Sequence, residues 1–303
     1  MSEITIPAES PLIDIRGVTR RFGEKTALHN ISLTIPSGGV FGLIGGNGAG
    51  KTTLIKHLLG LYRPQSGSVR VFGLDPVQDP VGTLGRIGYL SEDRDLPDWM
   101  RVGELMRYTQ AFFPKWDVKY AQELQQAFDL DPLAKVKTLS RGQRARAGLL
   151  IALAHRPELL VLDEPSSGLD PVVRRDILGA IIRTIADEGR TVLFSSHLLD
   201  EVERVADRLA IIHEGEILLT SSLDEIKESH RRLTLRFNSP HAAAPVLGSV
   251  LASDGHDTEW TYICHGKIDE LRRSAVAAGA TVVDEAALSL DEIFVSQIQS
   301  QRR

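Results

Sequence analysis

Apolar and polar residues alternate between residues 12 and 35. The apolar positions are Ile13, Ile15, Val18, Ile31, Leu33 and Ile35. A strand that buries one face and exposes the other shows this period of two. We therefore predict antiparallel strands with one solvated face in this region.

Three later segments are apolar throughout instead of alternating. They span residues 40–44, 159–163 and 191–195. Such runs are typical of strands that are covered on both faces. A further short strand is expected at 68–72, and segments with helical spacing lie at about 51–59, 172–187 and 198–206. Strands that alternate with helices in this way predict an α/β core with helices on both faces of its sheet.

The segment of about residues 93–157 breaks this alternation. Its pattern predicts helices at 101–113, 118–128 and 140–155, and prolines stand ahead of each of them at Pro97, Pro114 and Pro132. Proline often marks a helix boundary because its backbone lacks the N–H group that a helix needs. We predict a helical lobe inserted into the α/β core.

The character of the chain changes after Lys227. Strands are expected at 233–237, 260–263 and 280–283, and helices at 268–278 and 290–298. We predict a small α+β accessory domain of βαβα type at residues 230–303, after a larger domain at 12–227. Its histidines and cysteine lack the regular spacing of metal ligands; they are His241, His256, Cys264 and His265. We expect the domain at residues 230–303 to have a regulatory or dimer-supporting role.

Composition narrows the class of protein. Hydrophobic residues make up 42% of the 303 residues and charged residues 25%, as in an ordinary globular chain. The net charge of −5 gives no electrostatic reason to expect nucleic-acid binding. The one cysteine, Cys264, cannot form an internal disulfide and fits a reducing compartment. Residues 1–11 lack the features of a signal peptide, and apolar stretches such as 147–154 are too short to span a bilayer.

The most informative chemical motif is Gly-Gly-Asn-Gly-Ala-Gly-Lys-Thr at residues 45–52. A glycine followed after four residues by Gly-Lys-Thr is the spacing of a phosphate-binding loop, and the motif lies between an apolar strand and a helix, as it must. Backbone N–H groups of such a loop point at phosphates. Lys51 is expected to reach the outer phosphates, and Thr52 to place its hydroxyl on magnesium. The chain is therefore predicted to bind a nucleoside triphosphate.

A second motif ends the apolar strand at 159–163. Asp163 is placed to hold magnesium through water at the tip of the sheet. Glu164 is placed to orient and polarise an attacking water. Apolar strands that end in two acids are common, so this motif gains its weight as the partner of the phosphate-binding loop.

Residues 139–143 read Leu-Ser-Arg-Gly-Gln ahead of a predicted helix. A serine at a helix start can leave N–H groups free for a phosphate, although an isolated one is more often an ordinary cap. The order of the motifs along the chain favours the phosphate-binding interpretation over an ordinary helix cap. The phosphate-binding loop, residues 139–143 and Asp163–Glu164 are followed by Ser-Gly-Leu-Asp at 167–170 and Ser-Ser-His at 195–197. With this series, residues 12–226 resemble the nucleotide-binding subunits of ABC transporters.

The resemblance implies catalytic and metal-binding roles. Glu164 would be the general base, and His197 would be a catalytic switch residue that hydrogen-bonds the γ-phosphate. Thr52 and Asp163 would hold Mg²⁺, with Glu92 as a third group near the ion. The implied fold is a P-loop NTPase core with an antiparallel β subdomain and an inserted helical lobe.

The resemblance also implies how ATP is bound. The residues that would contact it are Phe22, Gly45, Gly46, Asn47, Gly48, Ala49, Gly50, Lys51, Thr52, Thr53, Ser140, Gly142 and Gln143. Phe22 would stack on the adenine, although a core phenylalanine at a strand end is the alternative interpretation. Ser140 and Gly142 would touch the ATP held by the opposite subunit. Ser167 and Asp170 would couple the two sites of the dimer.

Two positions depart from the pattern of the family. Glu92 stands where a glutamine is usual, and its carboxylate adds charge beside the γ-phosphate while remaining a suitable ligand for magnesium. We expect this to alter the rate without abolishing activity. Arg141 stands where a glycine is common, and its side chain is expected to point outward from the loop.

The function implied by the resemblance is an ATPase subunit that powers transport. It would work as a head-to-tail homodimer on the cytoplasmic face of the membrane, with integral membrane subunits encoded separately, and residues 289–294 resemble the tails of export systems. A soluble ABC-type ATPase of scaffold assembly or of the ribosome is the alternative. Chromosome-type members are excluded because Lys51 and Leu139 are too close for long coiled coils. The transported substrate is not encoded in these motifs.

Overall fold

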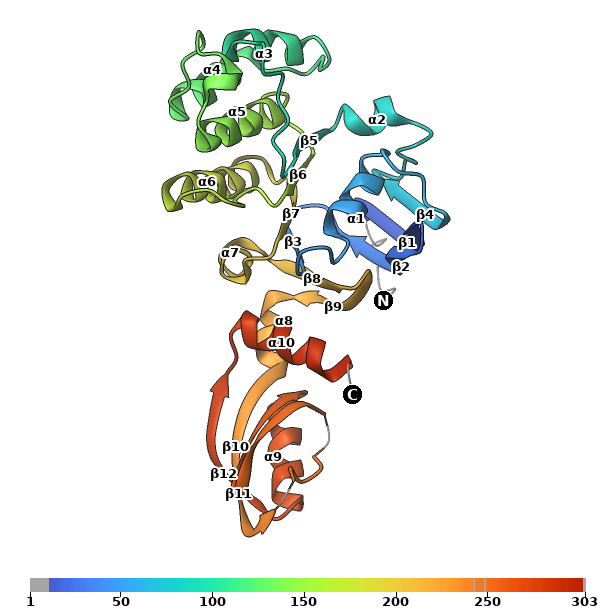
Figure 1. Ribbon diagram of the computed structural model, residues 1–303, viewed down its shortest axis with the longest axis vertical. Helices are drawn as coiled ribbons and strands as arrows, with labels where there is room; N and C mark the ends of the chain where they lie inside the picture. Colours follow the sequence, from blue (N-terminus) through green and yellow to red (C-terminus); the bar gives the residue numbers. More distant parts are fainter. Residues whose placement is uncertain (1–10, 242, 248, 302–303) are drawn as a thin grey trace, which may run out of the picture. The chain divides into compact units, whose positions relative to one another are not determined.

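A six-stranded sheet organises the N-terminal two thirds of the chain (Figure 1). The computed structural model describes residues 11–241, 243–247 and 249–301. They form two compact units, one from the residues before Asp207 with Ala210–Thr220 and the other from Asp207–Leu209 with the residues from Ser221 onward. The strands of the six-stranded sheet are β3 (Gly39–Ile44), β5 (Ile87–Leu90), β6 (Leu159–Asp163), β7 (Thr191–Ser196), β8 (Arg208–His213) and β9 (Glu216–Ser222).

The order of these strands determines where the chemical motifs meet. The spatial order is β5-β6-β7-β3-β8-β9, and the first four of these strands run parallel. Parallel strands leave their carboxyl ends at one edge of a sheet. The loops that follow Ile44, Leu90, Asp163 and Ser196 therefore gather along that edge.

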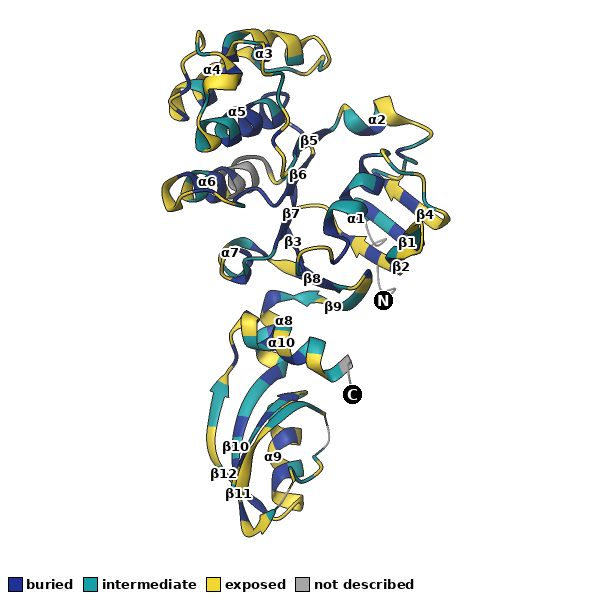
Figure 2. Ribbon diagram, in the orientation of Figure 1, coloured by how far each residue is buried: buried dark blue, intermediate teal, exposed yellow. Residues whose placement is uncertain are grey.

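The burial of the strands follows the two patterns in the sequence (Figure 2). β3, β6 and β7 are buried along almost their whole length, whereas β1 (Ile13–Phe22) and β2 (Lys25–Ile35) expose part of their residues. β1 pairs antiparallel with β2 and with β4 (Ser66–Val71). Their buried residues share one hydrophobic core with α1 (Lys51–Leu58).

The helical lobe is formed by α3 (Val102–Gln110), α4 (Val118–Ala127), the 3₁₀ turn Val136–Thr138 and α5 (Arg141–Leu153), drawn in green in Figure 1. α5 packs closely on β5 because Gly88 has no side chain: a Cβ there would lie 2.1 Å from the carbonyl oxygen of Ala152. The helices that follow β6 and β7 are α6 (Pro171–Glu188) and α7 (Leu199–Val205). The predicted α/β class, with an antiparallel subdomain and a helical lobe, is confirmed.

Some elements have no counterpart in the sequence-based prediction. They include the short α2 (Pro80–Leu84), β5, and the pair β8 and β9. Glu214 and Gly215 connect β8 to β9, and both have positive φ angles, 47° and 80°. Such a pair fits the two-residue turn that joins neighbouring strands. The Glu-Gly dipeptide between two apolar segments was a usable signal for this hairpin.

The second unit is an antiparallel sheet with helices. It contains α8 (Leu223–Ser229), β10 (His230–His241), β11 (Val250–His265), α9 (Ile268–Ala277), β12 (Ala280–Ala287) and α10 (Leu290–Gln301). The strand order is β11-β10-β12, so β10 lies between the two strands that α9 connects. The strands predicted at 233–237, 260–263 and 280–283 lie within β10, β11 and β12, so the unit has the order ββαβα and the βαβα description counts one strand too few. None of the helices in the described part of the chain has the length and apolar character needed to cross a bilayer.

Acid is expected to destabilise the first unit through His155. The side chain is 1% exposed, stacks on Phe113 at a centroid distance of 3.9 Å and contacts the carbonyl oxygen of Ile87 at 3.1 Å. Burial lowers the pKa of His155 to about 4. A group with a lowered folded-state pKa stabilises the fold as a neutral residue, so the stability is complete above the unfolded pKa and is lost as the pH falls toward 4. As the pH falls from 7 to 5, protonation of this histidine in the unfolded state should lower the free energy of unfolding by about 2 kcal/mol.

The variant His155→Gln checks this expectation, since glutamine stays neutral and can still donate to Ile87. Urea unfolding of both proteins at pH 7 and pH 5 measures the difference. The pH-dependent loss should be smaller in the variant by about 2 kcal/mol. Equal losses in the two proteins would assign the acid sensitivity to other groups.

Candidate functional site

The loop between β3 and α1 has the backbone that its glycines permit. Gly48 and Gly50 have positive φ angles of 77° and 115°, which other residues adopt only with strain. At Gly50 a Cβ would also lie 2.7 Å from the carbonyl oxygen of Ala27 in β2. Asn47 and Gly48 are exposed at the tip of the loop. The backbone can therefore curl around an anion at the start of α1.

A pocket of about 490 Å³ opens beside this loop. The predicted residues that line it are Phe22, Asn47, Gly48, Ala49, Gly50, Lys51, Thr52, Thr53, Glu92, Glu164, Ser167 and His197. Lys25 and Ala27 of β2 also line it and were not predicted. The pocket thus combines groups from the loops after β3, β5, β6 and β7, together with the end of β1.

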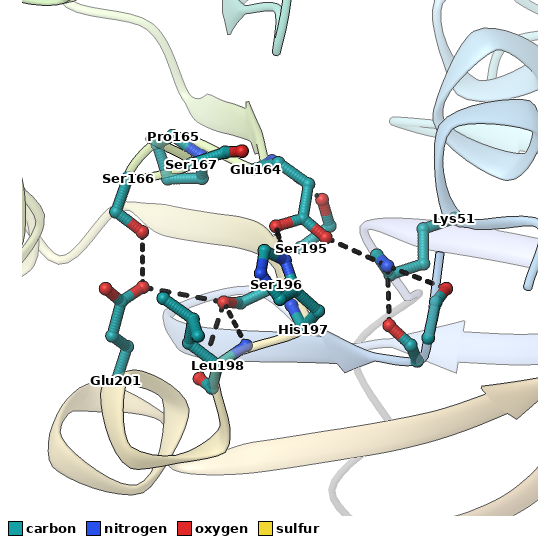
Figure 3. A network of polar contacts seen from close by, with 12 residues as sticks. Lys51, Glu164, Pro165, Ser166, Ser167, Ser195, Ser196, His197, Leu198 and Glu201 are labelled. Atoms are coloured by element: carbon teal, nitrogen blue, oxygen red, sulfur yellow. Dashed lines mark hydrogen bonds and ion pairs between the residues drawn. The ribbon is translucent and has the colours of Figure 1, made fainter. Parts of the chain in front are cut away.

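Glu164 lies at the centre of a polar network in this pocket (Figure 3). Its carboxylate forms an ion pair with the Lys51 ammonium at 2.9 Å and lies 2.6 Å from Nδ1 of His197. Lys51 also donates to the carbonyl oxygens of Gly45, at 2.6 Å, and Gly46, at 3.2 Å. Lys51 and Glu164 are 5% and 4% exposed. A buried cation and anion are thus held together where the sequence predicts the outer phosphates.

The backbone places the Glu164 side chain in the pocket at an energetic cost. Its φ angle is +47°, which is unusual for a residue with a side chain. The Glu164 N–H donates to Oγ of Ser195 at 3.0 Å, and this bond ties the turn to β7. Strain at a non-glycine residue often accompanies a functional position.

Asp163 and Thr52 provide oxygen atoms that suit magnesium. Oδ1 of Asp163 accepts from Ser195 at 2.8 Å, whereas the buried Oδ2 has no hydrogen-bond partner among the described residues. Burial raises the pKa of Asp163, and the neighbouring hydroxyls of Ser195 and Thr52 act against that rise. A cation would satisfy the free oxygen and favour the charged carboxylate. Glu92 lines the same pocket as Thr52.

Phe22 occupies the rim of the pocket and is 41% exposed, so it is not the core residue of the alternative interpretation. Tyr62 packs against its edge at a centroid distance of 5.5 Å, and the Arg20 guanidinium lies 4.7 Å from the ring centroid. These contacts hold the phenyl ring while leaving part of it open. An aromatic surface of this kind can stack on a nucleobase.

The segment Leu-Ser-Arg-Gly-Gln at residues 139–143, which we call the signature, lies apart from this pocket. Ser140 caps α5: its Oγ accepts from the Gln143 N–H at 3.1 Å, and Oε1 of Gln143 accepts from the Ser140 N–H at 3.0 Å. Ser140 is exposed. Ser140, Gly142 and Gln143 are absent from the residues that line the pocket. One chain therefore holds only part of the predicted ATP contacts.

The expectation for Arg141 needs a correction. Its side chain is exposed, yet it does not project away from its surroundings: a Cβ at Gly168 would lie 2.3 Å from a terminal nitrogen of the Arg141 guanidinium. Gly168 has a φ angle of +65° and no side chain, which leaves room for the guanidinium. Arg141 therefore connects the start of α5 with the loop that follows β6.

Ser167 and Asp170 lie in that same loop but have different surroundings. Ser167 lines the pocket. Asp170 accepts from the N–H groups of Val172, at 2.9 Å, and Val173, at 3.1 Å, at the start of α6. These hydrogen bonds lower the pKa of Asp170. The structure thus gives Asp170 a helix-capping role in addition to the coupling role predicted for it.

Two buried charged residues beside the pocket were not predicted. Arg94 donates to the carbonyl oxygens of Pro165 and Ser167, and Glu201 accepts from Ser166. In the sequence, only their spacing from predicted site residues could have pointed to them. Arg94 comes two residues after Glu92, and Glu201 comes four residues after His197. Neither spacing indicates a contact with the loop after β6.

Comparison with known proteins identifies the family that these features fit. A family model described as "ABC transporter" matches residues 28–167. The chain is 30% identical over 297 residues to the bacitracin transport ATP-binding protein BcrA of Enterococcus faecalis, covering 93% of this chain and 95% of that protein. It is 31% identical over 306 residues to the daunorubicin/doxorubicin resistance ATP-binding protein DrrA of Streptomyces peucetius, covering 94% and 91%.

Solved structures show the same similarity. One described as the ATP-binding subunit of an ABC transporter superposes with a TM-score of 0.66 at 26% identity. The match covers 71% of this chain and 92% of the solved one. The two curated relatives match over almost the whole chain, so their similarity extends past the part that the solved structure covers.

Proposed function

This chain belongs to the ATP-binding subunits of the ABC transporter family, and from that premise we propose that it hydrolyses ATP to power export through separately encoded membrane subunits. ABC ATPases bind ATP, and the pocket collects the residues that such a ligand needs. The coupling of hydrolysis to transport, the dimer and the membrane partners are the proposed parts.

The separation of the signature from the pocket supports a head-to-tail homodimer. Ser140, which is exposed, lies with Gly142 and Gln143 at the start of α5 outside the pocket, whereas Lys51, Glu164 and the other phosphate-side groups line it. A second copy can bring its own signature to the open side of the pocket, and a twofold arrangement completes both sites at once. ATP between the two copies would then hold the dimer closed.

ATP binding has to break the ion pair that Lys51 and Glu164 form in this structure. The Lys51 ammonium is paired with Glu164 at 2.9 Å, and both side chains are buried. The incoming phosphates would take Lys51 and the loop N–H groups as partners. The Glu164 carboxylate would then be free to face a water instead of a lysine.

Glu164 would act as the general base. Its carboxylate accepts a proton from the attacking water as the water oxygen bonds to the γ-phosphorus, and the bond to the bridging oxygen breaks to give ADP and inorganic phosphate. The ring of His197, now 2.6 Å from Glu164, can instead donate to the γ-phosphate. When bound to Thr52, Asp163 and Glu92, Mg²⁺ would supply charge that offsets the phosphate oxygens.

An apolar groove beside the Glu92 loop suits a membrane subunit. It has a volume of about 310 Å³ and is lined by Leu59, Leu61, Leu84, Ile87, Tyr89, Thr109, Phe113, Ile151, Ala152 and His155. Leu61 is 61% exposed there. Leu61 and Tyr89 also line the cavity that contains Glu92 and Asp163. A partner in this groove would therefore lie next to the loop that reaches the ATP pocket, as a transport function needs and a soluble ATPase does not.

Placing a charge in this groove is expected to release the partner. Leu61→Glu puts a carboxylate on an apolar contact, and desolvating it should lower co-purification with the membrane subunit at least about tenfold. The probe would be a membrane protein with about six apolar spans encoded by an adjacent open reading frame, pulled down from detergent-solubilised membranes. Val81→Glu is the matched control, because Val81 is 84% exposed in α2 and is not among the groove residues. Equal recovery of the partner with both variants would rule out this groove.

The alternative is a soluble ABC-type ATPase without transport. Export is favoured because BcrA and DrrA are named for bacitracin transport and drug resistance. For the accessory unit, a dimer-supporting or regulatory role is proposed. The deciding test is ATP hydrolysis in proteoliposomes with and without the neighbouring membrane protein. A rate that responds to the membrane protein supports the transporter, and a chain that never associates with it favours the soluble ATPase.

A further inference from the structure

Side chains from two other segments of the chain form hydrogen bonds with the loop between β6 and α6. We call residues Pro165–Asp170 the coupling loop. It follows Glu164 directly, and its Ser167 lines the ATP pocket. Three successive residues of this loop each accept or donate a hydrogen bond to a side chain distant in sequence: Pro165, Ser166 and Ser167. The partners are Arg94 and Glu201.

Arg94 holds the backbone of the coupling loop. Its guanidinium donates to the carbonyl oxygens of Pro165 at 3.0 Å and Ser167 at 2.9 Å. The residue is 3% exposed, and no ion pair to a carboxylate is found for it among the described residues. Burying a guanidinium against carbonyl oxygens alone is costly. Since Arg94 follows Glu92 by two residues, it ties the coupling loop to the Glu92 loop.

Glu201 holds a side chain of the coupling loop (Figure 3). Its Oε2 accepts from Ser166 Oγ at 2.5 Å and from Ser196 Oγ at 3.5 Å. Its Oε1 lies 3.1 Å from Nε of Arg174, in an ion pair that lacks hydrogen-bond geometry. Glu201 is 1% exposed. Because Ser196 precedes His197, Glu201 ties the coupling loop to the His197 turn.

We propose that Arg94 and Glu201 are positioning residues for ATP hydrolysis, which hold the coupling loop in register with the Glu92 loop and the His197 turn. The proposal rests on the ATPase function proposed above. Glu164 has a strained backbone and is the residue immediately before the coupling loop. Its carboxylate can stay aligned with the γ-phosphate only if that loop is fixed. A shift of about 1 Å in a catalytic group is enough to lower a rate by about 100-fold.

The same two contacts would make the coupling loop respond to both neighbouring loops. When the Glu92 loop or the His197 turn moves on ATP binding, Arg94 and Glu201 would move Ser166 and Ser167 with it. The coupling loop is also in contact with Arg141, at Gly168, from the start of the signature helix. Arg94, Glu201 and Arg141 therefore link the coupling loop to the Glu92 loop, the His197 turn and the start of the signature helix. All three elements are predicted to contact ATP or its magnesium ion.

The test uses the full chain with Glu201→Gln, Ser166→Ala and Arg94→Met. Glutamine keeps the shape of Glu201 but removes its charge, and methionine keeps much of the length of Arg94 without its donors. We expect kcat to fall about 10- to 100-fold in Glu201→Gln and Arg94→Met, with KM for ATP within about threefold of wild type. Ser166→Ala combined with Glu201→Gln should lose less turnover than the product of the two single losses, because both changes act on the Ser166–Glu201 hydrogen bond. Glu158→Gln is the control; it breaks an ion pair with Arg86 at the other end of β6.

The outcomes separate the two proposals. Turnover that is lost in Glu164→Gln but kept within about twofold in folded Glu201→Gln and Arg94→Met contradicts the positioning role alone. A rise in KM at unchanged kcat contradicts it as well, since the residues would then serve ATP binding. Turnover that survives Glu164→Gln contradicts the proposed function and with it the positioning role. If Arg94→Met fails to fold, the Ser166 and Glu201 variants decide by the same criteria.

Discussion

Glu164→Gln should lower steady-state ATP hydrolysis about 1,000-fold while leaving ATP bound. The carboxylate is the group that accepts the proton of water, and an amide cannot replace it. ATP binding should be equal to or tighter than in the wild type, because the ion pair between Glu164 and Lys51 would no longer compete with the phosphates. With hydrolysis blocked, the ATP-bound dimer should accumulate and elute earlier on size exclusion.

Phosphate release and size exclusion in the presence of ATP measure these two effects. Glu158→Gln serves as the control, since it makes the same chemical change in an ion pair with Arg86 away from the pocket. It should hydrolyse ATP at the wild-type rate and show no trapped dimer. Normal turnover in Glu164→Gln would remove the residue from its proposed role, and turnover loss without a dimer would contradict closure by ATP.

The site could be predicted from the sequence as far as its parts are local. The phosphate-binding loop is one continuous segment, and its glycines, lysine and flanking apolar strand are visible without knowing the fold. Asp163 and His197 could be placed because each ends an apolar strand, and parallel strands share one edge. The ion pair between Lys51 and Glu164 could not, because it joins the first residue of α1 to the residue after β6 through the strained backbone of Glu164.

The contacts of Arg94, Glu201 and Arg141 show where prediction from local pattern stops. Arg94 lies 71 residues before Pro165, and Ser166 lies 35 residues before Glu201. A buried arginine or glutamate has the same appearance in a sequence as one on the surface, since charge patterns report composition and not the partner that offsets burial. The second unit is similar: alternation predicted its strands, but nothing in the alternation indicated that β10 pairs with both β11 and β12.

Lys51→Ala should weaken ATP binding about 100-fold or more, in contrast to Glu164→Gln, which affects the chemical step. A lysine in a phosphate-binding loop makes charge-assisted hydrogen bonds to phosphate oxygens, and each is roughly twice as strong as a neutral one. Removing it also leaves the buried Glu164 carboxylate without its cation, so negative charge would remain in the pocket that the phosphates must enter. Both effects act in the same direction.

Titration of the full chain with a fluorescent ATP analogue measures the affinity. Lys56→Ala is the matched control, because it removes the same charge from the same helix but is not among the residues that line the ATP pocket. It should bind within about twofold of wild type, since the Lys56 ammonium lies over the Tyr62 ring beside the cavity next to the ATP pocket, where solvent and salt screen its charge. Unchanged affinity in Lys51→Ala would count against the loop as the phosphate site. A loss seen equally in both variants would show that the overall charge of α1, and not the ammonium held between Gly45, Gly46 and Glu164, governs binding.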